Sequence, residues 1–122
     1  MSTTVEGIEV HLGGLESVWE GGMREVYEYY RQHAGPSVAL AAAMVESAME
    51  LQTSGGRAPA PPQLLLGDLC LARASRLLAE TRDQRLQIGF ARAVEQVASA
   101  TAGGPPSDPL RTLLVAAVGD AG

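Results

Sequence analysis

Hydrophobic residues recur along this 122-residue chain at spacings of three and four, in segments separated by glycine and proline. Such spacing places apolar side chains on one face of a helix, whereas strands alternate every second residue. The pattern predicts four principal helices, near residues 14–34, 36–51, 63–80 and 83–101. We therefore expect an all-α fold, a small bundle of four principal helices completed by a short C-terminal helix.

Residues that break helices mark the limits of these segments. The segment 52–62 contains three prolines and two glycines, and residues 103–108 form a second break before the terminal helix. Residues 1–13 read as a loose arm of a single domain that spans residues 1–122. Thr81 and Gln84 have the spacing of a capping box for the helix that follows them. Gly21 and Gly22 interrupt the first helix, which indicates a kink or a close approach by a neighbouring helix.

The segment 63–80 is rich in leucine and organises the predicted fold. Its first half is apolar almost all round, interrupted only by Gly67 and Asp68, and charged residues follow in its second half. This pattern predicts a helix whose first half is central and whose second half reaches the surface. A chain this short has little to cover such a helix start, so we expect an interface there. The candidate interface residues are Leu64, Leu65, Leu66, Leu69 and Leu71.

Composition excludes several functional classes. The formal net charge is −5, and the nine cationic residues, all arginine, are spread along the chain among fourteen acidic residues. The sequence therefore has no basic stripe of the kind that binds nucleic acid. The single cysteine, Cys70, excludes a disulfide within the chain and is expected to be a buried, inert thiol. No apolar run is long enough for a membrane span, and the N-terminus lacks a signal-peptide pattern, so a cytoplasmic location is expected.

Candidate chemistry is sparse in this sequence, and we predict no catalytic, cofactor-binding or metal-binding residue. His11 and His33 lie in different segments, without the spacing of metal ligands. Glu46 and Glu50 share one helix face, where a solvated acidic edge is the simpler interpretation than a metal site. The cluster Tyr27, Tyr29 and Tyr30 is interpreted as core plus one partly exposed ring rather than as a ligand-stacking patch.

Residues 63–100 resemble the trans-isoprenyl diphosphate synthases, the polyprenyl synthetase family. The resemblance rests on Leu65-Leu66-Gly67-Asp68-Leu69-Cys70-Leu71-Ala72-Arg73-Ala74 and on the turn and helix that follow. In that family, a helix after the first aspartate-rich motif starts with leucine, any residue, glycine, aspartate and an apolar run. Gly67 and Asp68 are the matching motif residues. The nearer comparison is the non-catalytic small subunit of heterodimeric heptaprenyl diphosphate synthases.

The chain departs from the family where catalysis takes place. The family holds magnesium ions through two aspartate-rich motifs, whereas the four aspartates here are all more than five residues apart. The resemblance places Arg57 and Arg111 where the family keeps basic residues that bind diphosphate. Asp68 is expected to have a structural role, meeting the positive end of its helix and pairing with an arginine such as Arg73 or Arg92.

Three functional interpretations follow from these features. The first is a non-catalytic prenyl-synthase-like subunit that acts through protein–protein association, as a homodimer or with a catalytic synthase that it regulates or completes. The second is an unrelated small helical adaptor or ligand-binding module. The third is a magnesium-dependent prenyltransferase assembled from several copies, which requires carboxylates that the chain lacks, and magnesium is the cofactor only in this case.

Overall fold

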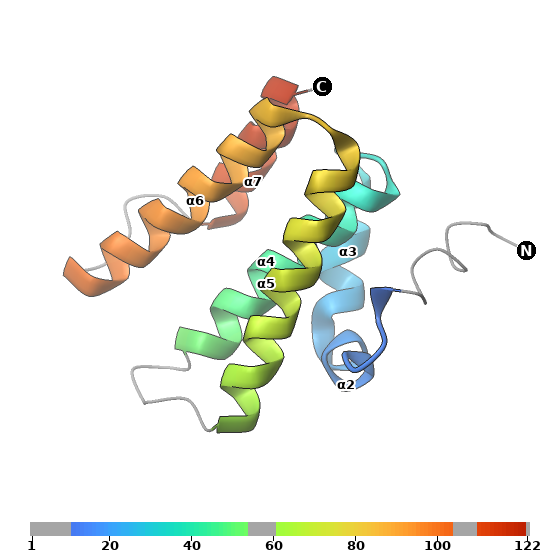
Figure 1. Cartoon of the computed structure of the whole chain (residues 1–122), viewed down its shortest axis with the longest axis vertical. Helices are drawn as coiled ribbons and strands as arrows, with labels where there is room; N and C mark the ends of the chain where they lie inside the picture. The colour runs from blue at the N-terminus through green and yellow to red at the C-terminus, as the bar shows by residue number, and fades with distance from the viewer. Residues whose placement is uncertain (1–10, 54–60, 104–109, 122) are drawn as a thin grey trace, which may run out of the picture.

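A computed structural model describes residues 11–53, 61–103 and 110–121 of the chain (Figure 1). Every regular element in these ranges is a helix, which confirms the predicted all-α fold. The elements are α2 (Glu16–Val18), η1 (Trp19–Met23), α3 (Arg24–Arg31), α4 (Pro36–Thr53), α5 (Pro61–Thr81), α6 (Gln84–Gly103) and α7 (Leu110–Ala121). None of the described helices is long and apolar enough to cross a membrane.

Helix α4 lies at the centre of the fold. It is flanked by α3 and α5, while α6 and α7 form a hairpin of two antiparallel helices to one side (Figure 1). Almost the whole circumference of α4 is buried, through Ala39, Leu40, Ala41, Ala42, Ala43, Met44, Val45, Ser47 and Ala48. Because alanine favours the helix and has a side chain of one carbon, α4 is thin enough for neighbours to approach it from several sides.

The first predicted helix is divided by a kink at Gly22. This residue has φ +142° and ψ −19°, a backbone conformation that a residue with a side chain rarely adopts, and it lies within the π-helical turn η1. A Cβ atom built on Gly21 or Gly22 would meet nothing within 4 Å. Of the two alternatives for this glycine pair, the structure therefore shows the kink rather than the close helix approach.

The turn between α5 and α6 corrects the predicted capping box. Helix α5 continues to Thr81, whose hydroxyl donates to the Leu78 carbonyl oxygen at 2.5 Å. The residue that caps α6 is Asp83, because its Oδ1 accepts a hydrogen bond from the Leu86 N–H at 3.1 Å. Thr81 instead accepts the Asp83 N–H at 3.2 Å, so it shapes the turn and does not start the helix.

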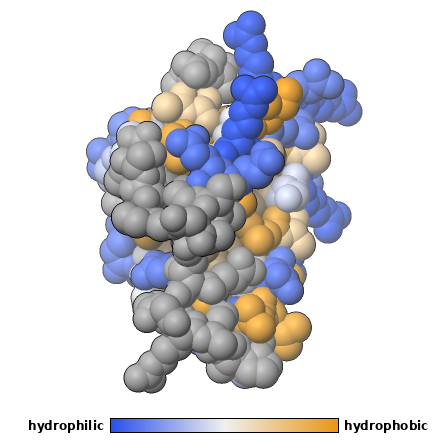
Figure 2. Space-filling model, turned by 90° about the vertical axis from the view of Figure 1, so that its left-hand side faces the viewer, coloured by the Kyte–Doolittle hydropathy of each residue, from blue (hydrophilic) through white to orange (hydrophobic). Residues whose placement is uncertain are grey.

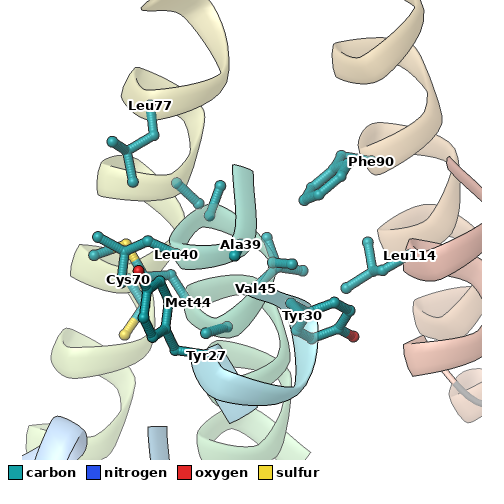
Figure 3. Packing of buried hydrophobic residues seen from close by; sticks show 14 of the residues in the cluster. Tyr27, Tyr30, Ala39, Leu40, Met44, Val45, Cys70, Leu77, Phe90 and Leu114 are labelled. Atoms are coloured by element: carbon teal, nitrogen blue, oxygen red, sulfur yellow. The ribbon is translucent and has the colours of Figure 1, made fainter. Parts of the chain in front are cut away.

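The α6–α7 hairpin packs closely on itself and joins the core through a few large side chains. A Cβ atom at Gly89 of α6 would lie 2.8 Å from Ala117 Cβ of α7, closer than two such atoms can come. Figure 3 shows Phe90 of α6 and Leu114 of α7 pointing toward Ala39 and Val45 of α4 and toward Tyr30 of α3. The hairpin is therefore held to α4 by these buried side chains.

Candidate interaction face on α5

Helix α5 has one buried face and one exposed face, and its burial corrects the prediction from sequence. The buried side includes Gly67 and Cys70 in the first half, and Ala74, Leu77 and Leu78 in the second. Leu64 and Leu65, in the first half, are 41% and 70% exposed. The expectation that the first half is central and the second reaches the surface was wrong, because apolarity along the chain does not show which side a neighbouring helix covers.

The five candidate interface leucines fall into two groups. Leu66, Leu69 and Leu71 are half-buried and pack against the core. Leu64 and Leu65 stand on the exposed side of α5, and Figure 2 shows hydrophobic residues at the surface near the end of the molecule where α5 begins. We define the outer face of α5 by its exposed residues from Leu64 to Ala79: Leu64, Leu65, Asp68, Ala72, Ser75, Arg76 and Ala79.

The family-motif residues Gly67 and Asp68 differ in burial. Gly67 is buried, whereas Asp68 is exposed. Because α5 begins at Pro61, two residues earlier than predicted, Asp68 also lies beyond the first turn, where the helix dipole acts most strongly. Asp68 does take part in an interaction within its own chain, and the structural role expected for this carboxylate stays a prediction.

Arg73, one of the arginines expected near Asp68, attaches the N-terminal segment to α5. Its Nη1 donates to the His11 carbonyl oxygen at 2.6 Å, across 62 positions of sequence. Leu12 and Leu15 are buried beside it, and a Leu15 N–H to Leu12 oxygen bond of 2.7 Å closes the turn between them. His11 and Leu12 of the predicted loose arm are therefore held against the fold, while residues 1–10 lie outside the described ranges.

The two glutamates of α4, Glu46 and Glu50, differ in burial. Glu50 is exposed, but Glu46 is half-buried and its Oε2 accepts the Tyr30 hydroxyl at 2.8 Å. Glu46 therefore links α4 to α3 and is not part of a solvated edge. Among the described residues, no three histidine, cysteine, aspartate or glutamate side chains gather as a metal site would require.

The tyrosine prediction is confirmed, since Tyr27 and Tyr30 are buried and Tyr29 is partly exposed.

Cys70 is a buried free thiol, as predicted. It lies among Leu40, Met44 and Tyr27 (Figure 3), and burial raises its pKa from 9.0 to about 11, partly offset by the charge of Arg73. The thiolate, which is the reactive form, is therefore suppressed at neutral pH. Nothing in this environment makes Cys70 a nucleophile.

We expect Cys70 to react with a thiol reagent at pH 8 about 100-fold more slowly in the folded protein than in denaturant, or more slowly still. The factor follows from the fraction of thiolate at a pKa of about 11 instead of 9.0. Because the folded pKa is the higher one, stability is retained below pH 9.0 and falls as the pH rises toward 11. Equal labelling rates in the folded and denatured protein would contradict the buried thiol.

The two candidate diphosphate residues are not described by this structure. Arg57 lies in the segment 54–60, outside the described ranges, and only the backbone of Arg111 is described, in α7. Their assignment stays a prediction.

No protein-family model, no curated protein and no solved structure matches this chain. The resemblance of residues 63–100 to the polyprenyl synthetase family therefore stays a prediction that rests on its motif residues.

Proposed function

We propose that this protein is a non-catalytic, prenyl-synthase-like subunit that acts by binding another protein chain through the outer face of α5. The single observation that carries the proposal is the exposure of two consecutive leucines, Leu64 and Leu65, on the helix that bears Gly67 and Asp68. The remainder of the outer face carries small and charged side chains, which suits a helix-packing surface with an apolar end.

An exposed leucine side chain costs free energy because water contacts its apolar surface. Full burial of one leucine side chain is favourable by roughly 1.5–3 kcal/mol relative to exposure. Because Leu65 is 70% exposed, most of this free energy would be gained only when a partner covers it. Leu64 beside it adds to the same apolar patch. A single exposed leucine needs no explanation, but an adjacent pair at the start of a helix is a suitable anchor for a partner.

Two features support a non-catalytic role. The aspartates in the described ranges are Asp68 in α5, Asp83 in the turn before α6 and Asp120 in α7, and none has a second aspartate within five positions. The half-buried carboxylate of α4, Glu46, accepts a hydrogen bond from the Tyr30 hydroxyl. Ionisation of an allylic diphosphate requires magnesium ions held by several convergent carboxylates, which these residues do not provide.

The test is co-expression of the tagged chain with each trans-prenyl synthase of the same organism, followed by purification and a chain-length assay. Wild type is compared with Leu65→Glu and with Ile88→Glu, a matched control at a 51% exposed position of α6. We expect association for wild type and Ile88→Glu and loss of association for Leu65→Glu. Prenyl transfer by the purified chain alone, with magnesium, isopentenyl diphosphate and an allylic diphosphate, would overturn the proposal.

The same experiment also separates the adaptor interpretation. If no complex forms with any synthase and the products of each synthase are unchanged, the prenyl-synthase part of the proposal fails. Association of the chain with itself, measured separately by sedimentation, would then leave only the protein-binding role of the outer face.

A further inference from the structure

We infer that the outer face of α5 pairs with the same face of a second copy of this chain, in antiparallel orientation about a two-fold axis at Ala72. This inference rests on the proposed function, since it names the occupant of the face through which the protein is proposed to bind. A two-fold interface requires a surface that is complementary to itself. The outer face of α5 has this property in both its spacing and its charge.

The spacing is symmetric about Ala72. Five exposed residues follow each other at intervals of three, four, four and three positions: Leu65, Asp68, Ala72, Arg76 and Ala79. Intervals of three and four keep side chains in one stripe along a helix, as in the seam of a coiled coil. The stripe lies opposite the side of α5 that Cys70 and Ala74 bury against the core.

Antiparallel pairing about Ala72 brings opposite charges together. Position 68 of one copy then faces position 76 of the other, so Asp68 meets Arg76 twice, once on each side of the axis. Parallel pairing in the same register would place Asp68 against Asp68 and Arg76 against Arg76. Because like charges in contact are unfavourable, the charge pattern selects the antiparallel arrangement.

Side-chain size fits the same register. Ala72 meets Ala72 at the axis, where small residues allow the two helices to approach closely. Leu65 of each copy lies opposite Ala79 of the other, so each leucine gains a contact partner and leaves water without a steric clash. The two ends of the stripe are thus complementary in size, and its two inner positions are complementary in charge.

The charged residues are accessible for such contacts. The intrahelical contact of Arg76 with Glu80 spans 4.0 Å, with both side chains more than half exposed, and such a pair contributes little. Asp68 is exposed and also takes part in an interaction within its own chain, which a second arginine would supplement. The other three positions of the stripe, Leu65, Ala72 and Ala79, are exposed as well.

The dimer is expected to be weak. One pair of helices of this length buries less than the roughly 1,600 Å² of a standard interface, which corresponds to dissociation in the micromolar range or weaker. Sedimentation velocity of the full chain should therefore extend to several hundred micromolar, roughly the range that such an affinity requires. We expect the wild-type protein to shift from monomer to dimer over this range.

Charge reversal tests the register. Asp68→Arg and Arg76→Asp should each weaken dimerisation about tenfold or more, because each places like charges across the axis. The double variant with both changes should regain the wild-type association, since it exchanges the two charges without altering the pattern. An equimolar mixture of the two single variants should also regain it, as a heterodimer. Circular dichroism of each variant controls for folding.

A cysteine at the axis provides an independent measurement. Ala72→Cys places two thiols at the two-fold axis, and mild oxidation should give a disulfide-linked dimer. Ala91→Cys, at an exposed position of α6, is the matched control and should remain monomeric under the same conditions. Native Cys70 is buried, so the wild-type chain, which has no other cysteine, should not cross-link.

A wild-type chain that stays monomeric at every concentration would overturn the inference, and so would a folded double variant that does not regain dimerisation. If the monomeric chain still binds a synthase through Leu65, the proposed function stands and only the identity of the partner is wrong. If Leu65→Glu changes neither self-association nor synthase binding, both proposals fail.

Discussion

Replacing Phe90 by alanine is expected to lower the free energy of unfolding by about 3–5 kcal/mol, a large part of the 5–15 kcal/mol of an ordinary domain. Phe90 is 2% exposed and lies between the α6–α7 hairpin and α4, where its ring faces Ala39 and Val45 (Figure 3). The alanines of α4 have no side-chain length with which to fill the cavity. Denaturant unfolding followed by circular dichroism measures the loss.

The matched control is Ile88→Ala on the same helix. Ile88 is 51% exposed, so its truncation should change stability by only about 0.5–1 kcal/mol. Hydrogen exchange adds a second measurement, because weakening the contact of the hairpin with α4 should increase exchange in α6 and α7 more than in α4 and α5. Equal losses for the two variants would show that Phe90 does not join the hairpin to the core.

The positions of the helices could be predicted from local pattern because local physics determines them. The second predicted helix, 36–51, is observed as Pro36–Thr53, and the third, 63–80, as Pro61–Thr81. Pro36 begins the second segment, Pro61 and Pro62 precede the third, and Gly55-Gly56 separates the two, which are sufficient signals. The cap of α6 was also visible, since Asp83 directly precedes the helix, but the Thr81 spacing directed the assignment to the wrong residue.

The centre of the fold could not be predicted in this way. The run of leucines directed the prediction to α5, yet the alanine-rich α4 is the helix that is buried on nearly all sides. Leucine indicates that burial of a helix face would stabilise the fold, whereas alanine indicates that neighbouring helices can pack closely. Only the tertiary arrangement shows which helix is central. A run of small residues in a short helical chain is therefore a signal for a central helix that was available but undervalued.

The contacts that give polar residues their roles were beyond the reach of spacing rules. Tyr30 and Glu46 are 16 residues apart, and Arg73 and His11 are 62 apart, so neither pair lies on a common helix face. The symmetric spacing about Ala72 is present in the sequence, but only burial shows which side of α5 faces solvent. The candidate interface leucines were identified from sequence, while their division into core and surface required the fold.

Replacing a leucine by alanine should destabilise the protein far more in the second half of α5 than in the first. Leu77→Ala is expected to destabilise the protein by about 2–5 kcal/mol, because Leu77 is 1% exposed and its removal leaves a cavity in the core. Leu65→Ala, on the same helix and with the same change in composition, should cost only about 0.5 kcal/mol or less in the monomer. Both are measured by denaturant unfolding at low micromolar concentration, below the range of self-association.

The comparison of these two variants distinguishes the observed burial from the pattern expected from hydrophobicity alone. A helix with a central first half would lose more stability at Leu65 than at Leu77. In the structure, the side chain of Leu65 is mostly exposed to solvent, so its truncation leaves no cavity in the core. The same Leu65→Ala variant, tested at several hundred micromolar, roughly the range of the expected dimer, should weaken association while its unfolding midpoint at low concentration stays unchanged. If Leu65→Ala lowers the denaturant midpoint of unfolding and leaves dimerisation unchanged, Leu65 belongs to the core and not to the interface.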